Sequence, residues 1–166
     1  MVLGMSLPAF TATHVLLGLI SIVAGGIAMW GLLRGNLLRG WTWLFLLMAI
    51  ATSGTGFMFP VTEIKPSHVF GAVTLVLLAL ALHALVVKRL EGRWRMAYVV
   101  SAMLTLYLNV VVLIVQMFEK VAPLAELEPT QGLWPLLATQ GVVLMAFVAA
   151  TVLGAIRFRP SPLHLA

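Results

Sequence analysis

Long apolar runs separated by short polar turns dominate the pattern of hydrophobic and polar positions along the chain. Five such runs stand out, and they cover about residues 10–33, 41–59, 67–87, 96–118 and 136–156. A helix of about 20 apolar residues, rising 1.5 Å per residue, crosses a hydrocarbon layer of ~30 Å. The pattern therefore predicts an all-α, polytopic integral membrane protein: a single transmembrane domain, residues 1–166, with five transmembrane helices.

The fourth run carries its polar residues in a regular pattern. Ser101, Thr105, Asn109 and Gln116 follow one another at i, i+4, i+8 and i+15, which places them along one face of a helix. A buried amide without a partner costs several kcal/mol in lipid, so this face must contact protein, water or a ligand. We expect the other helices to gather on it, with Asn109 paired to a hydroxyl such as that of Thr52, Ser53 or Ser21.

Charge is distributed unevenly between the two ends of the predicted helices. Eight of the ten basic residues fall on one side, and Lys65 and Lys120 lie on the other with four of the five acids. Cytoplasmic loops carry the excess of lysine and arginine, so we expect the N-terminus outside and the C-terminus in the cytoplasm. The basic residues of the cytoplasmic side are Arg34, Arg39, Lys88, Arg89, Arg93, Arg95, Arg157 and Arg159.

Composition agrees with a membrane protein and excludes several functions. The chain is 62% hydrophobic and 9% charged, whereas a soluble domain has about 25% charged residues. There is no cysteine, hence no disulfide and no thiolate chemistry. The net charge of +5 reflects the cytoplasmic turns and not a nucleic-acid partner. No phosphate-binding glycine loop or zinc-protease motif occurs, and enzymatic activity stays open.

Two histidines are predicted at similar depth near the outer surface. His14 lies about one turn into the first helix and His68 in the first turn of the third. Neutral imidazoles from facing helices ligate a b-type haem, so His14 and His68 are candidate metal ligands, with Gly18 and Gly71 making room and Lys65 or Lys120 meeting the propionates. In a haem-free form the histidines and Gln116 would hydrogen-bond a quinone. The predicted cofactor-binding residues are His14, His68, Asn109 and Gln116.

A second interpretation needs no cofactor. His14, Gly18, Ser21 and Gly25 form a stripe of small residues with histidine at its end, and such stripes are typical of helix packing. The predicted function is therefore a membrane electron-transfer or quinone-site subunit, or else a non-enzymatic accessory or assembly subunit of a larger membrane complex. Its partners would be the lipid bilayer and other membrane subunits.

Several short motifs resemble those of a group of small, uncharacterised bacterial inner-membrane proteins. They are Thr55-Gly56-Phe57-Met58-Phe59-Pro60, Trp94-Arg95 with Tyr98-Val99-Val100, Leu106-Tyr107-Leu108-Asn109-Val110, Val115-Gln116-Met117-Phe118 and Pro129-Thr130-Gln131. The similarity extends from about His14 to Arg159. It implies a multi-pass protein of the bacterial inner membrane and brings no activity with it.

Overall fold

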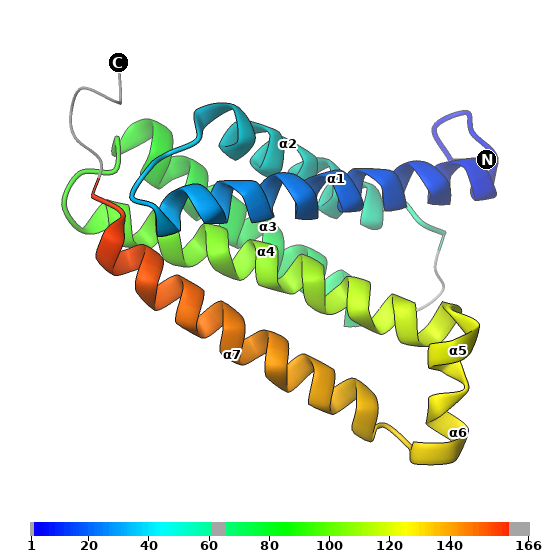
Figure 1. Ribbon diagram of the computed structural model, residues 1–166. Helices are drawn as coiled ribbons and strands as arrows, with labels where there is room; N and C mark the ends of the chain where they lie inside the picture. Colours follow the sequence, from blue (N-terminus) through cyan, green and yellow to red (C-terminus); the bar gives the residue numbers. More distant parts are fainter. Residues whose placement is uncertain (1, 61–65, 160–166) are drawn as a thin grey trace.

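The protein is a bundle of helices (Figure 1). A computed structural model describes residues 2–60 and 66–159, and the predictions that involve Lys65 and the acid Glu63 fall outside these ranges. The elements are α1 (Leu7–Leu33), α2 (Arg39–Gly56), α3 (Pro66–Leu82), the π-helix η1 (His83–Val87), α4 (Arg93–Lys120), α5 (Ala122–Ala125), α6 (Leu127–Gln131) and α7 (Trp134–Arg157). No strand occurs in the described residues.

All five predicted segments are helices, but only four of them are long and apolar enough to cross a membrane. These are Leu7–Leu33, His68–Val87, Arg93–Lys120 and Trp134–Arg157, which make this a multi-pass membrane protein. The remaining predicted span, about residues 41–59, corresponds to α2, which has 18 residues and ends at Gly56 instead of Phe59. It begins with Arg39 and ends in a Thr-Ser-Gly-rich turn, so its apolar centre is short.

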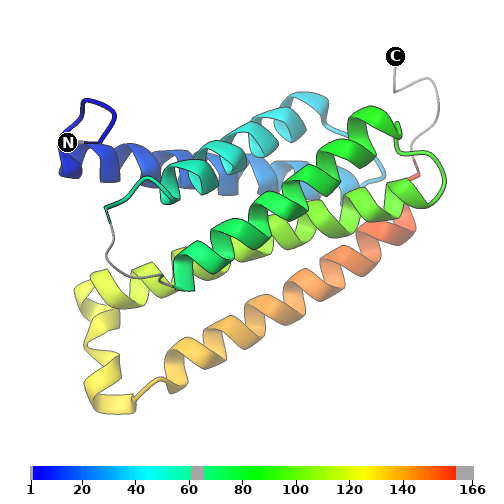
Figure 2. The ribbon, with the colours of Figure 1, turned by 180° about the vertical axis from the view of Figure 1, so that it is seen from behind.

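The helices run side by side, with their turns gathered at two ends (Figures 1 and 2). At one end, called here the basic end, lie the turns around Arg34–Arg39 and Lys88–Arg95 and the last turn of α7. The other, called the histidine end, holds the starts of α1 and α3, the end of α2, and α5 and α6. The long connection predicted between the last two segments contains these two short helices.

Local sequence explains where α1 begins and ends. The Ser6 hydroxyl accepts a hydrogen bond from the Ala9 amide at 3.4 Å, and Pro8 lies in the first turn, where its missing N–H is harmless. At the other end Gly35 has φ +79°, and the Asn36 amide donates to the Gly31 carbonyl at 2.8 Å. A left-handed glycine of this kind ends a helix and turns the chain back, here into α2.

The core lies in the half of the bundle next to the basic end. Ala24, Leu46, Ala81 and Val99 are fully buried there, one from each of α1 to α4. α7 joins this core through the second half of the helix, where Phe147 packs against it and Gly154 lies near Met103. Further along, α7 diverges from α4 toward α6 (Figure 1), and none of its most apolar window is buried.

The polar face of α4 points into the bundle, as its spacing predicts. Ser101 and Thr105 are buried, and the Ser101 hydroxyl donates to the Ala97 carbonyl at 2.6 Å. Asn109 Nδ2 donates to the Ser21 hydroxyl of α1 at 3.3 Å. Ser21 was one of three hydroxyls expected to pair with Asn109, and the interhelical hydrogen bond confirms it.

Candidate functional site

His14 is held in a defined orientation at the histidine end. Its Nδ1 lies 2.8 Å from the Thr55 hydroxyl of α2. That hydroxyl donates its own proton to the carbonyl of Ala51 at 2.7 Å. While the hydroxyl proton is on Ala51, Nδ1 of a neutral His14 carries the ring proton and donates to Thr55, and the free lone pair is on Nε2. If the hydroxyl turns to Nδ1 instead, the ring proton is on Nε2. In both arrangements the hydrogen bond fixes the orientation of the ring.

Aromatic rings surround this imidazole on the protein side. The Phe59 ring packs edge-on against His14 with 5.2 Å between centroids, and Phe10 contacts Phe59 at 4.9 Å. Phe10 is buried, and His14 itself is half-buried. A polar ring atom in such surroundings binds a polar ligand more strongly than it would in water, since competing solvent is reduced.

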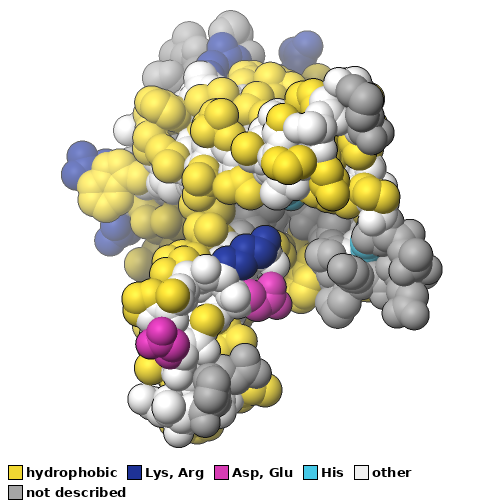
Figure 3. Space-filling model, turned by 90° about the vertical axis from the view of Figure 1, so that its right-hand side faces the viewer, with side chains coloured by type: hydrophobic (Ala, Val, Ile, Leu, Met, Phe, Trp, Pro, Cys, Tyr) yellow, Lys and Arg dark blue, Asp and Glu magenta, His cyan; other side chains and the backbone are white. Residues whose placement is uncertain are grey.

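The surface of the histidine end is hollowed. In Figure 3, which views this end, a hollow lies between the upper body and the lower arm formed by α5 and α6, and a basic and an acidic side chain lie at the top of that arm. Lys120, the described lysine of this end, acts electrostatically on the imidazole of His14. This end of the bundle thus combines an imidazole, a cation and the aromatic rings of Phe10 and Phe59.

His68 has different surroundings from His14. It packs against Phe57 of α2 with 5.8 Å between ring centroids, and it makes a further interaction. Both histidines therefore rest on the same end of α2, each through its own phenylalanine. α1 packs on α2, and α2 on α3, whereas the described residues of α1 and α3 share no substantial packing. The prediction that the two histidines lie on facing helices does not match this order.

The other two predicted site residues are hydrogen-bonded within the protein. Asn109 bonds Ser21 between α4 and α1, so its amide already has an interhelical partner. Gln116 Nε2 donates to Glu119 one turn further along α4, at 3.1 Å on the exposed surface. Each of these two amides therefore has a partner of its own in the absence of a ligand.

The small residues of α1 are occupied by helix packing. A Cβ added to Gly18 would lie 3.5 Å from the Thr52 methyl group, and one added to Gly25 would lie 2.6 Å from Leu106 Cδ1. On α3, a Cβ at Gly71 would lie 3.2 Å from the Phe57 ring. The stripe therefore lets α1 approach α2 and α4 closely, which is the packing role that its pattern also suggested.

These contacts decide how well a haem fits between the histidines. Phe57 fills the space beside Gly71, and Thr52 the space beside Gly18. Bis-histidine ligation would require α2 to move out from between α1 and α3. The arrangement as it stands does not fit the macrocycle.

The structure also shows site features that the sequence pattern did not. Thr55 is one of several hydroxyl-bearing residues in the C-terminal half of α2, and only the three-dimensional arrangement pairs it with His14. Gln140 of α7 reaches the Val111 carbonyl of α4 at 3.1 Å through Nε2, while its Oε1 is buried without a hydrogen-bond partner. Depth along a helix can be read from sequence, but the direction of a side chain around it depends on the neighbours.

Comparison of the chain with protein-family models finds no match, and neither curated proteins nor solved structures show significant similarity to it.

Proposed function

We propose that this protein is a quinone-site subunit of the bacterial inner membrane, with its site at His14 near the outer face. The observation that supports it best is the hydrogen bond between His14 and Thr55, which fixes the imidazole at the end of the bundle where the surface is hollowed. The resemblance to small bacterial inner-membrane proteins supports the location. The charge difference between the two ends supports an N-terminus outside the cytoplasm.

The proposed ligand is the hydroquinone form. In the tautomer with its proton on Nδ1, His14 would accept a hydrogen bond at Nε2, which matches the hydroxyl of a hydroquinone and not the carbonyl of the oxidised ring. The Lys120 ammonium would donate to the second oxygen, and Phe10 and Phe59 would contact the ring or its methyl groups. Bound quinol would supply electrons for transfer to a partner subunit. The chain itself would bind, orient and desolvate the head group.

The test is the affinity of the purified protein for decylubiquinol, a short-chain hydroquinone, measured from the thermal unfolding midpoint during titration. His14→Phe removes the acceptor and keeps a ring against Phe59. Since Thr55 keeps its bond to Ala51, this variant should fold. One lost hydrogen bond of ~1 kcal/mol weakens binding about fivefold. Thr55→Val removes the hydroxyl and should weaken binding similarly. Thr55→Ser keeps the hydroxyl and should bind decylubiquinol as the wild type does.

His83→Phe is the matched control, because His83 stacks on Trp94 with 5.0 Å between centroids at the opposite end. It should leave the affinity unchanged. Equal affinities of wild type and His14→Phe would refute the proposal. A Soret band in protein purified with haem supplied, lost in His14→Phe, would replace the quinone with the haem form.

One observation favours the accessory-subunit alternative: α7 has only Gly154 buried. In that case its exposed face, which includes Val142 and Met145, would contact a second membrane subunit. Val142→Trp would then release the partner from a complex that His14→Phe and His68→Phe leave intact. Quinol binding that depends on His14 would instead favour the leading proposal.

A further inference from the structure

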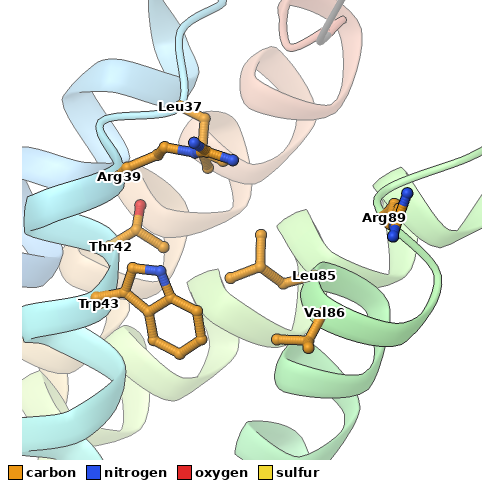
Figure 4. Close-up of a pocket in the computed structure, with 7 residues that line it drawn as sticks. All are labelled: Leu37, Arg39, Thr42, Trp43, Leu85, Val86 and Arg89. Atoms are coloured by element: carbon orange, nitrogen blue, oxygen red, sulfur yellow. The ribbon is translucent and has the colours of Figure 1, made fainter. Parts of the chain in front are cut away.

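Two cavities on the sides of the bundle differ in where they lie and in what lines them. One, of about 340 Å³, lies at the basic end between α2 and η1, where Arg39 and Arg89 are on opposite walls (Figure 4); Arg39 is already engaged in an interaction within the protein. The other, of about 170 Å³, lies between α4 and α7 and is called here the α4–α7 groove. Its lining is largely apolar and open to the surrounding lipid, since Leu144 is 44% and Val148 49% exposed.

Tyr107 brings a polar group into the α4–α7 groove at the middle of the bilayer. It lies near the centre of α4, and its ring packs against Phe147 of α7 with 5.5 Å between centroids. Thr151, the other hydroxyl-bearing residue of the lining, donates to the Phe147 carbonyl at 2.7 Å, whereas the Tyr107 hydroxyl has no hydrogen-bond partner among the described residues. Hydrocarbon tails cannot supply one at this depth. A protein group would.

The side of α7 next to the groove carries a protruding side chain and an empty space. Met145, near the centre of α7, is 68% exposed. Gly141 lies one turn earlier on the same side of the helix, and an added Cβ there would meet nothing within 4 Å in the described part of the chain. Glycine weakens a helix, and small residues on a membrane helix let a second helix approach closely. Gly141 thus has room for a neighbour that the single chain does not provide.

Depth selects which side chain of a second copy could reach the groove. Copies of one membrane protein insert in the same orientation, so a two-fold axis between them runs along the membrane normal and leaves the depth of each residue unchanged. Met145 is two residues from Phe147, the contact of Tyr107, and so lies within about 3 Å of it along the helix. Its thioether contacts aromatic rings favourably and accepts a weak hydrogen bond, which suits Tyr107.

We propose that two copies of this chain associate through α7, with Met145 of each inserted into the α4–α7 groove of the other beside Tyr107. The protruding side chain and the groove lie next to each other on one chain, as an isologous interface requires. Gly141 would allow the two α7 helices to approach. None of the most apolar window of α7 is buried within one chain, against 39% of that of α4. The interface does not involve His14 and is independent of the quinone site.

The first test counts chains in liposomes. Protein labelled at a single introduced cysteine, Glu126→Cys, is reconstituted at increasing protein-to-lipid ratios, and single-molecule photobleaching gives the fraction of dimers. This parent protein should dimerise reversibly. Met145→Ala and Gly141→Leu should each raise the dissociation constant at least about tenfold, because the symmetric contact loses its side chain, or the room for it, twice. Tyr107→Phe keeps the ring and removes only the hydroxyl, so it should weaken the dimer less, by about threefold.

Matched substitutions on other helices are the controls. Val76 of α3 is 70% exposed, and Gly26 of α1 has nothing within 4 Å of an added Cβ among the described residues. Val76→Ala, Gly26→Leu and His14→Phe should all dimerise as the parent does. A parent protein that stays monomeric at every density would overturn the proposal and leave the groove to lipid or to a different subunit. Dimers with an unchanged dissociation constant in Met145→Ala and Gly141→Leu would overturn it as well.

Disulfide trapping keeps the proposal testable if a variant of the first test does not fold. The chain has no cysteine of its own, so copies with Met145→Cys and copies with Val148→Cys, carrying different tags, can be produced together and oxidised in the membrane. A disulfide between the two tagged copies is expected. Val76→Cys combined with Val148→Cys should form none. Failure of folded Met145→Cys and Val148→Cys copies to cross-link above that control would refute the interface.

Discussion

The hydrogen bond from Asn109 to Ser21 ties α4 to α1 in the middle of the apolar layer. Its two partners do not depend on it equally. A serine hydroxyl that loses its partner can turn to the carbonyl four residues earlier in its own helix. The Asn109 amide has two N–H donors and an acceptor oxygen to satisfy, so the loss of Ser21 leaves more hydrogen-bonding groups without a partner on this part-buried side chain.

We therefore predict that Ser21→Ala lowers stability by about 1–3 kcal/mol, the cost of an unsatisfied buried group. Asn109→Leu should cost less, nearer the ~0.6 kcal/mol average of membrane hydrogen bonds. The double variant should resemble Asn109→Leu alone, because the alanine then leaves no amide unpaired. Thermal unfolding in detergent measures all three. Additive losses of stability in the double variant would mean that the two side chains do not interact. Leu104→Val, on the exposed side of α4, is the control and should change stability little.

At the level of single residues, sequence spacing predicted which face of α4 is buried, because a period of 3.6 links position to direction. It did not predict that α1 and α3 each pack on α2. Equal depth says nothing about which helix lies between two others, and here α2 does, with Phe57 against one histidine and Phe59 against the other.

Among the helices, α1 approaches α2 and α4 closely at Gly25. A Cβ there would lie 2.6 Å from Leu106 Cδ1 and 2.8 Å from the Phe45 ring. Both of these side chains are buried at 2% exposure and have little room to move. The next residue, Gly26, has nothing within 4 Å of the same added atom. Alanine substitution at Gly25 therefore tests the packing between helices, whereas the same substitution at Gly26 tests helix propensity alone.

We expect Gly25→Ala to destabilise the bundle by about 1–3 kcal/mol through overpacking. Gly26→Ala should stabilise it by up to about 1 kcal/mol, because alanine has the higher helix propensity. Thermal unfolding in the same detergent compares the two. A gain in stability for both variants would show that α1 and its neighbours can separate without cost, contrary to the tight contact at Gly25.

Hydropathy predicts the approximate lengths of the helices, but polar residues at the helix ends shift the start of α1 and the end of α2. α1 begins at Leu7, earlier than its apolar run suggested, because Ser6 caps it. α2 ends at Gly56, earlier than expected, since Thr55 and its neighbours form a polar, glycine-containing turn. The cavity lined by Arg39 and Arg89 could not be predicted, because it depends on the π-helical turn that brings η1 beside α2.

For the whole molecule, the position of α2 determines how many times the chain crosses the membrane. α2 runs beside α1 in the opposite direction (Figure 1), and its 18 residues extend about 27 Å, close to the ~30 Å of a hydrocarbon core. A helix packed along a spanning neighbour shares its depth. We therefore retain five crossings as a proposal, with the basic end in the cytoplasm.

The natural absence of cysteine allows a direct test with single cysteines at Asn36, Pro60 and Glu126, all of them exposed. In spheroplasts a membrane-impermeant maleimide should label Pro60→Cys and Glu126→Cys, and should reach Asn36→Cys only after permeabilisation. If α2 does not cross, Pro60→Cys will behave like Asn36→Cys, since nothing between them would traverse the bilayer. The reverse pattern at all three positions would invert the molecule, placing His14 in the cytoplasmic half and the Arg39–Arg89 cavity in the outer leaflet.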